Sequence, residues 1–167
     1  MDLGLGYYAS GVWGWPLGLF GVYLHLMEIE QIERVYIKLE MDGKSVLSLL
    51  LSASGAVNRM GDGSGDKSVS KFAMGRVDEP LFAQFMDGIS PELFDLAGRY
   101  EMPDPKGKPC YLEMSFEGED IDTGIAFSFG SQSDGPPEDL MNLVELAVEL
   151  TDPWYDEYLT KGNPKRK

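Results

Sequence analysis

The sequence contains very few of the side chains that most often carry catalysis or bind metals. Its 167 residues include one histidine, His25, and one cysteine, Cys110. With a single histidine, neither a histidine-based triad nor a multi-histidine metal site can be built within the chain. With a single cysteine no internal disulfide is possible, which suits a reducing compartment, so we expect a cytoplasmic protein. Since no cofactor motif occurs, we also expect no cofactor.

Positive charge is scarce. The chain has 14 Lys and Arg against 28 Asp and Glu, for a net charge of -14. Four of the basic residues fall in the last seven, so residues 1–160 carry -18. A field of that sign repels nucleic acid and anionic membranes, and it speeds encounter with a basic protein. We therefore expect no nucleic-acid partner. A basic protein partner and plain solubility both stay open as explanations of the charge.

Residues 3–27 contain no charged side chain of either sign, and the segment is long enough to cross a bilayer. Six glycines and Pro16 weaken a helix there, and no Lys or Arg flanks the segment closely. We therefore interpret residues 1–26 as a Gly/aromatic arm docked on the body, or as a misplaced start. A membrane-anchored accessory protein remains the alternative.

Alternating hydrophobic residues predict strands over 32–41, 44–52, 56–60, 68–74, 110–117 and 123–130. Asp42-Gly43 between the first two predicts a tight hairpin turn. We expect these side chains to face the core: Val35, Ile37, Leu39, Leu112, Met114, Phe116, Phe127, Phe129, Leu140, Leu143 and Ala147. Cys110 is predicted to face inward as well, as an inert buried thiol.

Helices are predicted between and after the strands. Asp78 is expected to cap a helix that ends at Gly88, and Ser90 to cap a short one that Gly98 stops. The longest helix starts after residues 134–137, and Asp152-Pro153 restarts or kinks the chain. The prediction is one α+β domain over residues 27–160, an antiparallel sheet of five or six strands with helices mainly on one face, followed by a basic tail at 161–167.

Two acidic segments are candidate sites. Asp62 and Asp66 occupy ligand positions of a calcium-binding loop, but Lys67 and Ala73 replace its glycine and its last glutamate, which leaves the two aspartates as weak metal candidates. The second segment surrounds the turn between the last two strands, and with two tyrosines near the C-terminus it forms the predicted binding set: Glu113, Glu117, Glu119, Asp120, Asp122, Tyr155 and Tyr158.

The stretches SLLLSASGAVNRMG, LFAQF, CYLEMSFEG and TGIAFSFG, with Gly-Pro-Pro-Glu before the last helix, resemble a group of small bacterial hairpin-helix-hairpin-helix domains. The emfourin-type protease inhibitors belong to that group. The resemblance covers residues 45–160 and implies a non-enzymatic binding domain, and no inhibitory residue transfers to this chain. We therefore expect an acidic interaction module, such as an inhibitor or immunity-like partner of a basic protein. A carboxylate-dependent enzyme or a metal-binding domain is the alternative.

Overall fold

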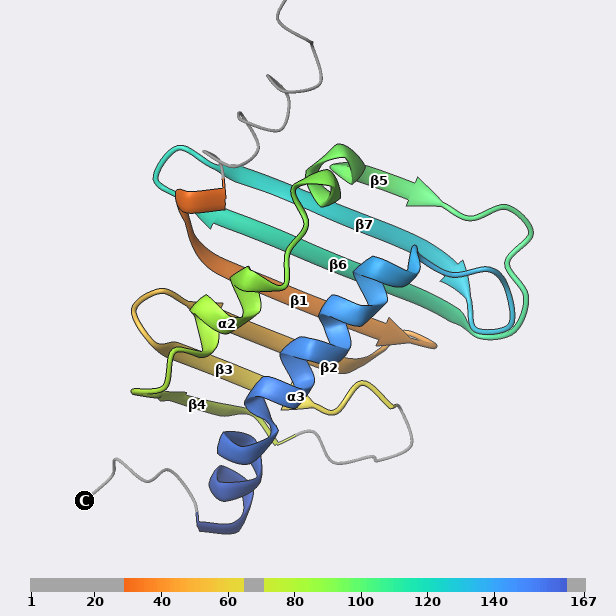
Figure 1. Ribbon diagram of the computed structural model, residues 1–167. Helices are drawn as coiled ribbons and strands as arrows, with labels where there is room; N and C mark the ends of the chain where they lie inside the picture. Colours follow the sequence, from red (N-terminus) through yellow and green to blue (C-terminus); the bar gives the residue numbers. More distant parts are fainter. Residues whose placement is uncertain (1–28, 65–70, 162–167) are drawn as a thin grey trace, which may run out of the picture.

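The structure is a computed structural model that describes residues 29–64 and 71–161. Within them the chain forms one sheet in the order β4-β3-β2-β1-β6-β7-β5, with α2 and α3 lying across one face (Figure 1). The strands are β1 (Ile32–Met41), β2 (Lys44–Ser52), β3 (Ala56–Gly61), β4 (Ala73–Arg76), β5 (Gly98–Glu101), β6 (Pro109–Gly118) and β7 (Asp122–Gly130). The helices are α2 (Leu81–Asp87), the 3-10 helix η1 (Pro91–Leu96) and α3 (Glu138–Lys161).

The central strand, β1, joins two halves of the sheet. It pairs antiparallel with β2 on one side and with β6 on the other. The predicted turn at Asp42-Gly43 is confirmed, since both residues have positive φ (54° and 71°) and Met41 pairs with Lys44. Both halves of the sheet are therefore assembled on β1.

The α+β class is confirmed, but the predicted count of five or six strands is wrong because the sheet has seven. The additional strand is β5, which begins at Gly98, where the sequence predicted only the end of a short helix. β5 follows η1 directly and lies at the edge of the sheet, where it pairs parallel with β7. Its four residues are all exposed, so it has no buried alternation to reveal it. β4 runs over Ala73–Arg76 rather than 68–74, and residues 65–70 lie outside the described part.

The predicted cap at Asp78 is wrong. The helix α2 begins at Leu81 with Pro80 at its N-cap position, because a proline disfavours helical geometry in the residue before it. Gly88 ends α2 as predicted. Ser90 holds the N-cap position of η1, but its hydroxyl bonds the Glu92 side chain instead of a backbone N–H.

The helix α3 is 24 residues long and continues through Pro153 without a restart. Its axis changes direction in its last turns (Figure 1). A proline removes one helical hydrogen bond, and bending there is its usual consequence. Near this point the ring of Trp154 packs so closely on Gly75 of β4 that a Cβ on the glycine would lie 3.1 Å from it. The helix therefore reaches the β4 edge of the sheet.

The core lies between the sheet and the helices. Every residue predicted to face inward is buried, except that Phe129 at the end of β7 is only half-buried. Cys110 is buried as predicted. The alternation of each strand thus decides which side chains meet the helices and which lie on the opposite face, called the open face below.

Candidate functional site

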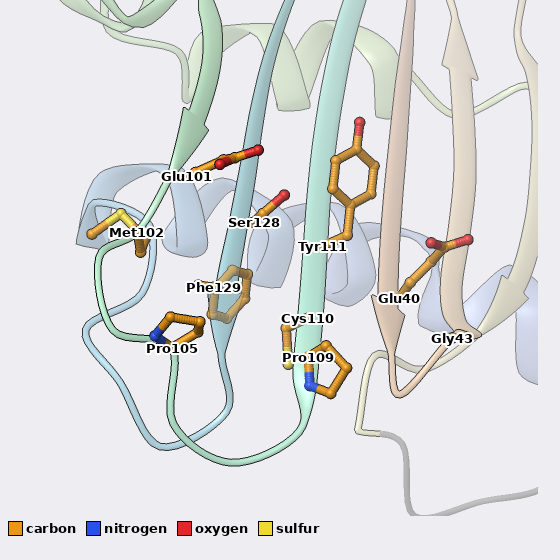
Figure 2. Close-up of a pocket in the computed structure, with 10 residues that line it drawn as sticks. All are labelled: Glu40, Gly43, Glu101, Met102, Pro105, Pro109, Cys110, Tyr111, Ser128 and Phe129. Carbon is orange, nitrogen blue, oxygen red and sulfur yellow. The ribbon is translucent and has the colours of Figure 1, made fainter.

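On the open face, the side chains of neighbouring strands form rows across the sheet. Pairing aligns Glu40 with Tyr111, Tyr111 with Ser128, and Ser128 with Glu101. This row lines a hollow of about 520 Å³ whose other walls come from the loop before β6 (Figure 2). The hollow thus combines two carboxylates, a phenol and a hydroxyl with apolar surface from prolines and Met102.

The row already has a cation of its own. Lys38 of β1 lies 2.8 Å from the Glu40 carboxylate and 5.9 Å from the centre of the Tyr111 ring. The hydrogen bond to Glu40 raises the pKa of Lys38, which keeps the ammonium charged. An outside cation would therefore have to displace Lys38 from this carboxylate.

Two groups at the hollow, Tyr111 and Cys110, have raised pKa values that favour their neutral forms. Tyr111 donates a hydrogen bond of 3.2 Å to Glu113, and burial first, then the Glu113 charge, raises the pKa of its phenol. Burial also raises the pKa of the Cys110 thiol, which contacts the carbonyl oxygen of Lys108 at 3.5 Å. Because a thiolate and not a thiol is the nucleophile, this arrangement does not prepare Cys110 for covalent catalysis.

This makes a prediction for thiol chemistry. In the folded protein at pH 8, Cys110 should react with iodoacetamide roughly tenfold or more slowly than in the same chain unfolded in urea, since both burial and the raised pKa reduce the accessible thiolate. Mass spectrometry of the labelled chain measures both rates, and the unfolded chain is the control. Equal rates would show that the thiol is accessible and that its pKa is not raised, and a faster rate in the folded protein would show an activated thiol.

Most of the net negative charge lies elsewhere, in the two segments that carry the helices. Residues 77–97 and 134–161, called the helix layer below, contain 13 acidic residues and one basic residue, for a net charge of -12. The remaining residues together carry only -2. Twelve of the 13 acidic residues are exposed, and the exception, Asp152, is half-buried.

Of the predicted acidic binding set, Glu117, Glu119, Asp120 and Asp122 lie at or beside the β6–β7 turn, and Glu113 lies in the middle of β6, paired with Ala126. Glu113 and Glu117 are half-buried on the open face, and Glu119, Asp120 and Asp122 are exposed. Register places Lys38 beside Glu113 and Arg34 beside Glu117, where Arg34 Nε lies 3.6 Å from the carboxylate. These cations of β1 offset the charge that the sequence alone suggested for β6. Four of the five acidic residues are therefore gathered at the turn, and Glu113 and Glu117 have basic neighbours.

The two predicted tyrosines have different surroundings. Tyr155 is buried, donates a hydrogen bond of 2.8 Å to the carbonyl oxygen of Lys71 and accepts one of 3.2 Å from the Gly61 amide. It is therefore positioned to fix α3 on the sheet. Tyr158 is half-buried beside Trp154, with ring centres 5.8 Å apart, and it retains exposed surface for a partner.

Of the weak metal candidates, Asp62 accepts hydrogen bonds from the amide and the hydroxyl of Ser64, at 3.0 and 2.8 Å. Asp66 lies outside the described residues. Within residues 29–64 and 71–161, no three His, Cys, Asp or Glu side chains are grouped closely enough to hold a metal ion.

Sequence reasoning missed Arg59, a fully buried cation on the inward face of β3. Its Nη2 atom lies 2.7 Å from Asp152, Nη1 donates to Val148 and Thr151 of α3, and Nε donates to Gly61. Its position in the alternation of β3 could have indicated burial, because Arg59 lies on the same face of the strand as Val57 and Gly61, which are buried too. Three of the four polar groups that hold Arg59 belong to α3, so it serves to attach this helix to the sheet.

No family model matches this chain, and no curated protein matches it either. In the part of the chain that the structure describes, no helix has both the length and the apolar character needed to cross a bilayer.

Proposed function

We propose that this protein is a non-enzymatic interaction module that binds a basic protein through the helix layer. The observation that carries the proposal is the separation of charge between the two faces. The helix layer has a net charge of -12, while on the open face Arg34 and Lys38 of β1 lie beside Glu117 and Glu113 of β6 and offset their charge.

Helical spacing concentrates part of this charge in one stripe. Glu138, Glu145, Glu149 and Asp156 follow each other at intervals of seven, four and seven, which places them on one side of α3. The buried residues of α3, such as Leu140 and Ala147, lie on the opposite side, against the sheet. The stripe therefore points away from the sheet.

Basic residues within reach do not neutralise the stripe. Glu145 and Glu149 are four residues apart and repel each other, and among the ion pairs within α3 only Lys161 with Glu157, at 3.2 Å, is formed in the described part. A cationic surface would relieve this repulsion when it binds. The charge would act mainly on the association rate, since exposed charges are screened within about 8 Å at physiological salt.

The resemblance to emfourin-type inhibitors supports the proposal from a different direction. From β2 onward the elements run hairpin, helix, hairpin, helix, although β4, η1 and β5 are inserted between them. We propose on this basis that the partner is a basic protease or toxin that the module restrains.

The test compares two variants that each lose three negative charges. The helix-layer variant carries Glu138→Gln, Glu145→Gln and Glu149→Gln, and the hairpin variant carries Glu113→Gln, Glu117→Gln and Glu119→Gln. A partner is captured from the source cells by the wild-type protein, purified, and its binding rates are measured at 20 and 150 mM salt. We expect a basic partner whose association slows about tenfold in the helix-layer variant at low salt, with little change in dissociation.

Two outcomes would count against the proposal. A larger effect of the hairpin variant would move the binding surface to the β6–β7 turn. An acidic or neutral partner, bound equally well at both salt concentrations, would refute the electrostatic basis altogether. Unfolding curves of both variants serve as controls: the exposed helix-layer substitutions are expected to alter stability by no more than about 0.5 kcal/mol each. Glu113→Gln and Glu117→Gln also weaken a hydrogen bond and an ion pair, so they should cost no more than about 1 kcal/mol each.

A further inference from the structure

Within the helix layer there is an apolar groove of about 440 Å³ between the segment that follows α2 and the first half of α3. Its apolar lining comes from Leu93 and Leu96 of η1 and from Leu143 and Leu146 of α3. Leu96 and Leu146 are only half-buried, so part of this apolar surface faces solvent. Covering it would be favourable by about 25 cal/mol for each Å² removed from water.

The groove is bounded by carboxylates and a close backbone contact. Glu92 and Asp139 lie on its two sides, and a hydrogen bond from Ser90 to Glu92 fixes one of them. At one wall the chain passes so near α3 that a Cβ on Gly88 would lie 2.6 Å from Leu146. The two walls are therefore held together by packing, and the apolar lining has a negatively charged rim.

We infer that this groove receives the apolar side chains of a short basic segment of the partner, an amphipathic helix with leucine-like residues on one side and Lys or Arg on the other. The inference rests on the proposed function and specifies which kind of basic segment the protein would bind. The leucines of the groove require apolar side chains in the occupant. The residues on either side of those side chains would meet Glu92, Asp139 and a helix layer of net charge -12, so we infer that they are basic. Charge then sets the rate of encounter, and the groove sets which basic segments stay bound.

Two peptides and two variants of the full chain separate the groove from the charge. The first peptide has 16 residues, with leucines at helical spacing and lysines elsewhere, and the second has serine in place of every leucine at the same charge. Asn142→Arg places a cation and a large side chain in the groove, since Asn142 is exposed and lines it. Gln84→Arg makes the same chemical change at an exposed position of α2 that is not among the groove residues.

We expect the leucine peptide to bind about tenfold or more tightly than the serine peptide. Asn142→Arg should weaken binding of the leucine peptide by about tenfold, while Gln84→Arg changes it by about twofold or less. Titration calorimetry at 50 mM salt measures the affinities. With the wild-type protein, amide shifts in NMR should move at Gly88 and Leu146 and not at Gln84, which tests the groove even if a variant folds poorly.

The outcomes distinguish the two levels of the proposal. Equal binding of both peptides, with equal effects of both variants, would refute the groove and leave the charged layer standing. Failure of both peptides to bind at 50 mM salt would refute the groove and the proposed affinity for basic partners together. Shifts confined to the open face would refute the groove and place the contact on the other side of the sheet.

Discussion

Replacing Arg59 with alanine is expected to lower the free energy of unfolding by about 3 to 5 kcal/mol. The guanidinium is 1% exposed and is held by four polar groups, three of them on α3. It also lies 4.6 Å from the centre of the buried Tyr155 ring. The substitution removes charge-assisted hydrogen bonds, strands their buried acceptors and leaves a cavity, so each effect acts in the same direction. Equilibrium unfolding in urea measures the loss.

Two related variants locate the origin of this effect. Arg34→Ala removes an exposed ion pair with Glu117 and should cost no more than about 1 kcal/mol. Arg59→Met keeps much of the buried stem without the charge, so it should cost less than Arg59→Ala. If Arg59→Ala cost no more than Arg34→Ala, the buried guanidinium would not attach α3 to the sheet.

The alternation of hydrophobic and polar residues revealed the strands that have one face on the core, which β5 does not. Val35, Ile37 and Leu39 alternate with polar residues, and Asp42-Gly43 supplies the two positive φ values that a tight turn requires. The same logic misplaced only Phe129, at the end of its strand, where helical cover is incomplete. Local patterns therefore fixed most of the layer arrangement.

What the sequence could not supply depends on pairing between distant segments. β5 is four exposed residues whose only regular partner is the backbone of β7, so its composition carries no trace of the sheet. The charge of Glu117 looked available until register placed Arg34 beside it. The sequence also gives the net charge of each segment, but only the fold shows that the two segments holding nearly all of it lie together on one face of the sheet.

The second large effect concerns Phe116 at the centre of the core. This side chain is fully buried on β6, and its ring lies 5.1 Å from that of Phe94 in η1, tilted by 57°. Phe116→Ala should lower the free energy of unfolding by about 3 to 5 kcal/mol, through lost transfer free energy and the cavity left behind. Phe72→Ala makes the same change at a side chain that is 49% exposed, and it should cost no more than about 0.5 kcal/mol.

Beyond global stability, the same substitution should loosen η1 selectively. A six-residue 3-10 helix has weak internal hydrogen bonding, so its position depends on Phe94 and Leu93, the two residues it buries. Removing the ring beneath Phe94 should therefore speed amide hydrogen exchange in η1 more than in β1, at a urea concentration where the variant stays folded. Because Leu93 also lines the groove, the leucine peptide should bind this variant more weakly than the wild type, with Phe72→Ala unchanged. Uniform acceleration of exchange across η1 and β1, with unaltered peptide affinity, would show that the groove does not depend on this core contact.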